Sequence, residues 1–97
     1  VRYPRGAGIG IRPEPQMQAI PLGQSRLILE GQKVAILNFG TLFGDAKEAA
    51  SALGATLIDM RFVKPIDERA IIDAAAKHEL LVTIEDGAIA GGAGNAV

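Results

Sequence analysis

The sequence contains no cysteine and no tryptophan, and it has a single histidine, His78, among its 97 residues. Disulfides and thiolate metal sites are therefore excluded, and His78 would form a zinc site only if at least two carboxylates converged on it. Neither sign of charge is in excess, because ten Lys and Arg residues stand against eleven Asp and Glu, for a net charge of −1. This balance predicts neither a nucleic-acid partner nor a strongly charged protein partner.

Long hydrophobic runs are missing as well. No stretch has the length needed to span a bilayer, and the first residues lack the pattern of a signal peptide, so we expect no membrane partner. The 97 residues suffice for one small domain with a modest core. Because the sequence starts at Val1 and stops within what resembles an opening helix, we expect a piece of a longer protein, truncated at its C-terminus.

The first 22 residues are rich in glycine and proline and have few apolar side chains to bury. Such a composition is typical of a linker that runs in an extended path over a surface. We therefore divide the sequence into residues 1–22, which end a preceding domain and form a linker, and residues 23–97, which form an incomplete α/β domain.

The clearest pattern is a strand–helix–strand unit between Val34 and Pro65. Residues 34–37 form the short apolar run of a strand buried on both faces, and Leu57–Val63 reads as a second strand. Between them, Thr41 offers a hydroxyl that could cap a helix, and Gly54 suits its end. Two strands joined by a helix are almost always parallel. The apolar positions with helical spacing are Leu42, Ala46, Ala49, Ala50 and Leu53.

A further strand is predicted before this unit. Residues 26–30 alternate in polarity, and Gly31-Gln32-Lys33 supplies a tight connection, so we expect a hairpin whose first strand is antiparallel to residues 34–37. The first strand would lie at an edge of the sheet, where Arg26 discourages pairing with other chains.

A second helical crossover follows Pro65. Asp67 is a good N-cap and Ile66 has the spacing of a hydrophobic staple with Ile71. Residues 80–84 form the next strand, and Gly91–Gly94 lead into a third helix. The predicted fold is thus α/β, a three-layer domain with a mostly parallel sheet and one antiparallel edge strand. The predicted buried stripe of the second helix comprises Ile71, Ile72, Ala75 and Ala76.

Ligands of open parallel sheets bind beyond the carboxyl ends of the strands. Here these ends carry Asn38 with Thr41, Arg61 with Lys64, and Glu85 with Asp86. Arg61 and Lys64 could hold a small anion, but we favour an ion pair between Asp59 and Arg61. We also favour His78 as a cation at a helix end over a catalytic residue.

Two glycine-rich stretches do not meet the requirements of a phosphate loop. Residues 6–10 have neither the strand nor the helix that must flank such a loop, and residues 91–94 lack the Lys-Ser/Thr of a Walker motif. Close packing of a helix on the sheet explains residues 91–94 at least as well. The motif Arg2-Tyr3-Pro4-Arg5-Gly6 is different, because arginine suits bidentate binding of phosphate. It is a candidate phosphate clamp.

Taken together, several motifs resemble the C-terminal region of the 1-deoxy-D-xylulose-5-phosphate synthase family, which is transketolase-like. They are RYPRG, VAILNFGT, ATLIDMRFVKPID and AIAGGAGNAV. The β subunits of 2-oxo acid dehydrogenases share the domain, but their segment at DMRFVKP typically reads more like DLRTLLPWD. A sister enzyme of the same fold is therefore the alternative, and a non-catalytic binding or oligomerisation module is another.

The resemblance implies a transferase that condenses pyruvate with D-glyceraldehyde 3-phosphate and releases CO₂, in isoprenoid and thiamine biosynthesis. Thiamine diphosphate and Mg²⁺ would be held by two upstream domains, of which residues 1–22 are the end of the pyrimidine-binding one. Arg5 would bind the phosphate of the acceptor, and no residue of the piece would be catalytic or bind cofactor or metal. Residues 23–97 would support a homodimer, and the isolated piece would be inactive. The enzyme would be cytoplasmic in a bacterium or plastidic in a plant.

Overall fold

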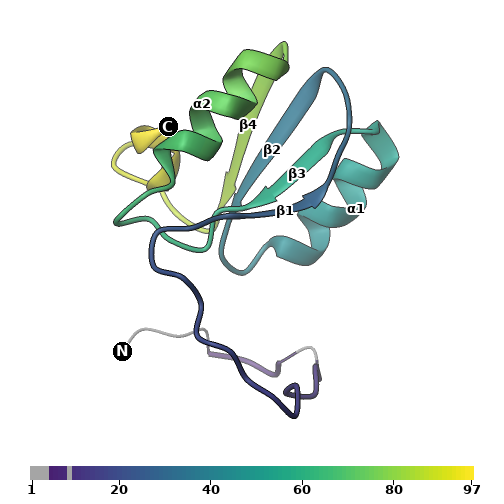
Figure 1. The fold of residues 1–97 in the computed structure, drawn as a ribbon, viewed down its shortest axis with the longest axis vertical. Helices are drawn as coiled ribbons and strands as arrows, with labels where there is room; N and C mark the ends of the chain where they lie inside the picture. Colours follow the sequence, from purple (N-terminus) through teal and green to yellow (C-terminus); the bar gives the residue numbers. More distant parts are fainter. Residues whose placement is uncertain (1–4, 9) are drawn as a thin grey trace.

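The computed structural model describes residues 5–8 and 10–97 (Figure 1). Residues 5–8 and 10–22 are exposed and contain bends and a turn but no helix or strand. In Figure 1 they form an extended segment that projects from an α/β body. The path over a surface that the composition predicts for the linker stays a prediction, because the described residues of this segment are exposed and lie away from the α/β body.

The described part of the body contains one sheet of four strands in the order β1-β3-β2-β4. β2 pairs in parallel with β3 on one side and with β4 on the other, while β1 lies antiparallel to β3 at an edge. The mostly parallel sheet with one antiparallel edge strand is thus confirmed. The strands are β1 (Arg26–Leu29), β2 (Val34–Phe39), β3 (Thr56–Asp59) and β4 (Leu80–Glu85).

The two helices lie on opposite faces of this sheet, which gives the three predicted layers (Figure 1). α1 (Phe43–Leu53) packs through Ala46 and Ala50 on the face that carries Ile36 and Leu57 of the sheet. α2 (Glu68–Lys77) packs on the other face, in a second core cluster. That cluster comprises Ala35, Leu37, Phe39, Ile58, Met60, Ile71, Ala74 and Ala93.

The predicted hairpin is wrong, because β1 pairs with β3 and not with β2. Both sides of β2 are occupied by parallel neighbours, so an antiparallel strand can add only at the outer edge of β3 or of β4, and β1 adds to β3. Residues 30–33 therefore cross from the end of β1 past the start of β3 before the chain enters β2. At this crossing the Gln32 N–H donates to the Gly54 carbonyl at 3.0 Å, and the Gly31 N–H donates to Thr56 Oγ1 at 2.9 Å.

Two predicted element ends also differ from the structure. β3 stops at Asp59, because Arg61 takes a left-handed backbone conformation (φ 59°) that a strand cannot contain, so the strand predicted to reach Val63 is too long. α1 has Leu42 at its N-cap without a side-chain cap, so the capping role predicted for Thr41 is wrong. Gly54 ends α1 in the left-handed conformation (φ 61°), as predicted.

The apolar faces of the helices are narrower than predicted. In α2, Ile71 and Ala74 are buried, whereas Ile72 is 66% exposed, and Ala75 and Ala76 are exposed as well. The sheet contacts one side of α2 only, and none of the described elements covers the side that carries Ile72. Leu53 of α1 is likewise exposed. The predicted third helix is a short 3-10 helix, η1 (Ala93–Ala96), in the described residues.

Gly31 lies in the crossing from β1 to β2, at a position where the backbone of residues 54 and 55 leaves no space for a side chain. A Cβ there would overlap the Gly54 carbonyl oxygen and the Ala55 carbonyl carbon, which are backbone atoms and cannot rotate away. We predict that Gly31→Ala lowers the free energy of unfolding by about 2 kcal/mol or more. Urea unfolding followed by far-UV circular dichroism measures the change.

Gly44→Ala is the matched control for this prediction. Gly44 lies in α1, and a Cβ at this position would meet no atom within 4 Å beyond the backbone of its own helix. Alanine should therefore leave the stability unchanged or raise it by up to about 1 kcal/mol. Equal losses in the two variants would show that close packing at Gly31 is not the cause.

Candidate functional site

Arg5 is the predicted phosphate ligand, and it lies at the start of the described extended segment, where it is exposed to solvent. Its guanidinium is therefore accessible from outside the α/β body. Arg2 and Tyr3, which complete the RYPRG motif, lie outside the described residues. The phosphate clamp formed by this motif stays a prediction.

Two of the polar residues at or near the carboxyl ends of the strands, Asn38 and Asp59, have partners within the fold. Asn38 is fully buried, and its Nδ2 donates to the Gly40 carbonyl at 3.1 Å. The predicted ion pair between Asp59 and Arg61 is wrong, because Asp59 lies 3.5 Å from Arg26 (Oδ2 to Nη2). The register of the antiparallel pair places Arg26 directly opposite Asp59, whereas the strand ends before Arg61.

Glu85, at the end of β4, binds the glycine-rich stretch that follows it. Its carboxylate accepts hydrogen bonds from the Ala93 N–H at 2.6 Å and from the Gly94 N–H at 3.0 Å. A Cβ on Gly92 would overlap the Ala88 carbonyl oxygen, and one on Gly94 would lie 2.5 Å from Thr83 Oγ1. These glycines therefore allow close packing of the chain around Glu85. Close packing is the explanation that we weighed against a phosphate loop for residues 91–94.

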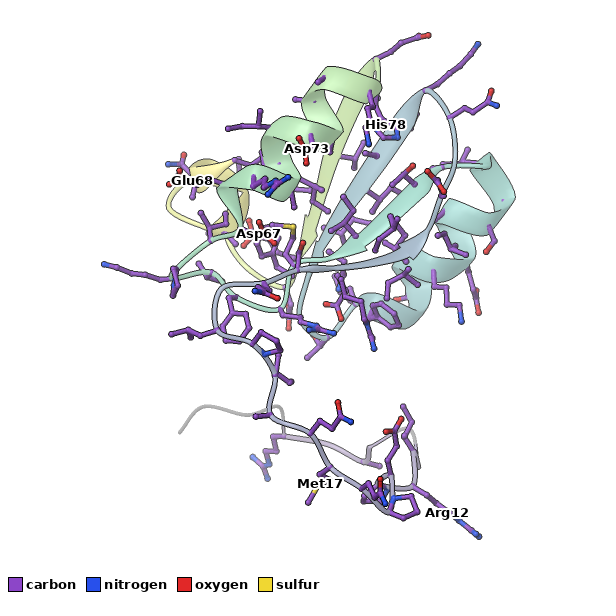
Figure 2. The ribbon with its side chains drawn as sticks, viewed as in Figure 1. Arg12, Met17, Asp67, Glu68, Asp73 and His78 are labelled. Carbon is purple, nitrogen blue, oxygen red and sulfur yellow. The ribbon has the colours of Figure 1, made fainter. Side chains whose placement is uncertain are left out.

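The Asp67 carboxylate joins the N-terminus of α2 to the start of β1, near the base of α2 in Figure 2. Its Oδ1 accepts from the Ala70 N–H at 3.1 Å, which confirms the predicted N-cap. Its Oδ2 accepts from both the N–H and the hydroxyl of Ser25, each at 2.8 Å. These hydrogen bonds, above all the one from the Ser25 backbone, lower the pKa of Asp67 from its ordinary value.

His78, at the other end of α2, belongs to a hydrogen-bond network (Figure 2). Its Nδ1 lies 2.8 Å from the Ala74 carbonyl and its Nε2 lies 2.7 Å from Thr56 Oγ1. Since a carbonyl only accepts, Nδ1 carries a proton and donates it to the Ala74 carbonyl. Thr56 Oγ1 in turn accepts from the Gly31 N–H. His78 thus connects α2, β3 and the crossing to β2.

A groove of about 350 Å³ lies beside α2, over β1 and β3. Leu27, which is 56% exposed, contributes to its apolar wall. Charges of both signs line it, with Glu30 and Asp73 against Lys33 and Lys77. This mixture selects neither an anion nor a cation, so the groove indicates no particular ligand.

The described residues show neither a metal-binding cluster nor a membrane-spanning helix. Residues 5–8 and 10–97 contain no group of three or more His, Asp or Glu side chains placed to hold a metal ion. In the same part of the chain, no helix is both long and apolar enough to cross a bilayer.

Three comparisons relate the chain to known proteins. The family model described as "Transketolase, C-terminal domain" matches residues 23–97. The 1-deoxy-D-xylulose-5-phosphate synthases of Pseudoalteromonas atlantica and Aeromonas hydrophila are 60% and 59% identical to the chain over 97 residues. Each match covers 100% of this chain and 16% of the relative, so the chain spans about one sixth of their length.

A solved structure described as "Split gene transketolase, inactive beta4 tetramer" has the same fold. It superposes on the chain with a TM-score of 0.76 at 32% sequence identity. The match covers 86% of this chain and 29% of that chain.

Replacing Asp67 tests the link between α2 and β1. We predict that Asp67→Ala lowers the free energy of unfolding by about 1–3 kcal/mol at neutral pH, because α2 loses its cap and Ser25 loses its acceptor. The folded state lowers the pKa of Asp67 from its ordinary value of 3.8. The ionised carboxylate therefore stabilises the fold fully at pH values above this ordinary pKa. This contribution declines as the pH falls through the lower, folded-state pKa.

Urea unfolding at a series of pH values measures both effects. The difference in the free energy of unfolding between parent and variant should decrease as the pH falls below the ordinary pKa of Asp67. Asp73→Ala is the control, since Asp73 lies 3.9 Å from Arg69 in an exposed pair that contributes about 0.5 kcal/mol or less. A gap that is independent of pH would contradict the role of the Asp67 charge.

Proposed function

Because the chain belongs to the transketolase C-terminal domain family, we propose that it forms the C-terminal part of a thiamine-diphosphate-dependent 1-deoxy-D-xylulose-5-phosphate synthase. Such an enzyme condenses pyruvate with D-glyceraldehyde 3-phosphate and releases CO₂. The observation that carries the proposal is the extent of the match, which includes all 97 residues at 60% identity and therefore both Arg5 and the α/β body. This match favours the synthase over the β subunit of a 2-oxo acid dehydrogenase.

In this proposal Arg5 binds the phosphate of the acceptor. A guanidinium offers paired N–H donors that match two phosphate oxygens, and its charge does not depend on pH in the physiological range. Arg5 is exposed and lies outside the described helices and strands, so it is free to reach a site formed by other parts of such an enzyme. Its role is to orient the substrate, so that the aldehyde of the acceptor faces the reacting carbon.

Thiamine diphosphate supplies the carbon nucleophile in enzymes of this family, and we assign its binding, with that of Mg²⁺, to parts of the enzyme other than these 97 residues. This assignment is supported by residues 5–8 and 10–97, which contain no group of three or more His, Asp or Glu side chains placed to hold a metal ion. The contribution of this chain to the reaction is therefore binding and orientation.

A second role is proposed for residues 23–97, namely support of a homodimer. Three carboxylates of the body are engaged internally. Asp67 binds Ser25, Glu85 binds the backbone of residues 93–94, and Asp59 pairs with Arg26. The similar split-gene transketolase structure is described as a tetramer, which is consistent with a domain that serves assembly.

Arg5→Ala tests the phosphate assignment in a chimera, in which residues 1–97 replace the matching segment of the Pseudoalteromonas atlantica synthase. Losing a charge-assisted hydrogen bond costs about 1.5–3 kcal/mol, so we predict that the KM for D-glyceraldehyde 3-phosphate rises about tenfold to a hundredfold. The KM for pyruvate should stay within about twofold, because pyruvate has no phosphate. Steady-state kinetics with each substrate varied in turn measures both constants.

Arg12→Ala is the control for charge, because Arg12 is an exposed arginine of the same segment (Figure 2). It should leave both KM values unchanged. If Arg5→Ala instead weakened pyruvate binding and left the acceptor KM normal, the assignment of Arg5 to the phosphate would be wrong.

The 97 residues by themselves should have no synthase activity, because we assign the cofactor site to other parts of the enzyme. We predict no measurable CO₂ release from pyruvate and D-glyceraldehyde 3-phosphate when thiamine diphosphate and Mg²⁺ are added to the purified chain. The chimera, assayed in parallel, is the positive control. Turnover by the chain alone at a rate proportional to its concentration would contradict the assignment of the cofactor to other parts.

A further inference from the structure

The segment of residues 10–22, here called the strap, exposes large apolar side chains to solvent. Ile11 is 78% exposed, Met17 85%, Ile20 61% and Leu22 73%. Figure 2 shows Met17 and Arg12 on the strap, away from the α/β body. The strap carries only two charged residues, Arg12 and Glu14. The body therefore leaves these four large apolar side chains of the strap uncovered.

The composition of the strap is unlike that of a flexible spacer. Flexible spacers consist of small and polar residues, such as glycine and serine, whereas full burial of each large apolar side chain of the strap would contribute about 1.5–3 kcal/mol. Its prolines, Pro13, Pro15 and Pro21, fix their φ angles and so lower the entropy lost when the segment is held in one conformation. A stiff segment with apolar side chains is suited to lie against a surface.

Both ends of the strap are held, if the proposed function is correct. At its C-terminal end, Ser25 is bound to Asp67 through two hydrogen bonds of 2.8 Å, and the Gln24 N–H closes a turn onto the Pro21 carbonyl at 3.3 Å. At its N-terminal end, Arg5 would bind the acceptor phosphate in a site formed by other parts of the enzyme. A segment anchored at both points runs across the surface that lies between them.

We infer that the strap docks through Ile11, Met17, Ile20 and Leu22 on an apolar surface of the rest of the same polypeptide. The inference rests on the proposed function, because it takes the remaining length from relatives of which this chain matches 16%. A mainly apolar partner surface with few charges fits the strap, since only Arg12 and Glu14 are charged. The strap thus fixes the α/β body to the part of the enzyme that binds substrate.

Oxidation of Met17 by hydrogen peroxide tests the inference, because the rate of methionine oxidation follows exposure of the sulfur. The chain has two methionines, Met17 and Met60, and Met60 is fully buried. Peptide mapping by mass spectrometry follows both residues in the chimera, with a synthetic peptide of residues 10–22 as the exposed reference. We expect Met17 to be oxidised more slowly in the chimera than in the peptide, as the buried Met60 should be.

Variants of the chimera identify the surface. Ile20→Ser with Leu22→Ser should release the strap and restore rapid oxidation of Met17, while Leu53→Ser, at a 69% exposed position of α1, should not. Slow oxidation of Met60 shows that a variant is folded. If the double variant unfolds, the oxidation rate of Met17 in the parent chimera, compared with that in the peptide, tests whether the strap is covered.

Two outcomes would overturn the inference. Oxidation of Met17 in the chimera as fast as in the peptide would show that nothing covers the strap. Protection that disappears on dilution would assign the surface to a second copy and not to the same polypeptide. Neither measurement depends on enzymatic turnover. Evidence against the proposed reaction is therefore distinguishable from evidence against docking of the strap.

Discussion

The position of β2 between two parallel neighbours is the constraint on which the rest of this structure depends. Parallel neighbours cannot be joined by a tight turn, so each connection needs a helix. One crossover leads from β2 to β3 and the other returns from β3 across β2 to β4, which places α1 and α2 on opposite faces. The central strand is then covered on both faces, with Ala35 and Leu37 fully buried and Ile36 nearly so. The outer edge of β3 is left for β1.

Polar side chains of the body stabilise this arrangement at the points where elements meet. Asp67 holds α2 against the start of β1, His78 and Thr56 hold α2 against the crossing into β2, and Glu85 orders the chain after β4. Each connects residues that are distant along the chain or fixes a turn without regular structure. Their side chains are therefore committed to structure, and the residue assigned to substrate, Arg5, lies outside the body. In the proposed function, the extended segment therefore binds substrate, and the named polar side chains of the body stabilise the fold.

The sequence allowed prediction of those features that depend on neighbouring residues. The strand–helix–strand unit, the Asp67 cap, the Gly54 helix end and the fold class follow from local spacing and from rules of connection, and they were confirmed. The hairpin and the Asp59–Arg61 pair were wrong, because both depend on which strand edge remains free after the parallel pairs have formed. The Ser25–Asp67 and Thr56–His78 contacts leave no local signal for the same reason. Of the candidate site, the sequence predicts Arg5 through its motif, and the proposed phosphate contact would depend on groups outside the α/β body.

The pairing of β1 with β3 also has a consequence for the order of folding. A hairpin would have formed early from adjacent residues, whereas Arg26 must find Asp59 across the whole strand–helix–strand unit, and closing that long loop is entropically costly before β3 exists. β1 therefore joins the sheet after β2, α1 and β3 are assembled. As an edge strand of four residues, it is also among the elements that detach at the lowest free energy. Transient opening of β1 would free the Arg5 segment while leaving the core intact.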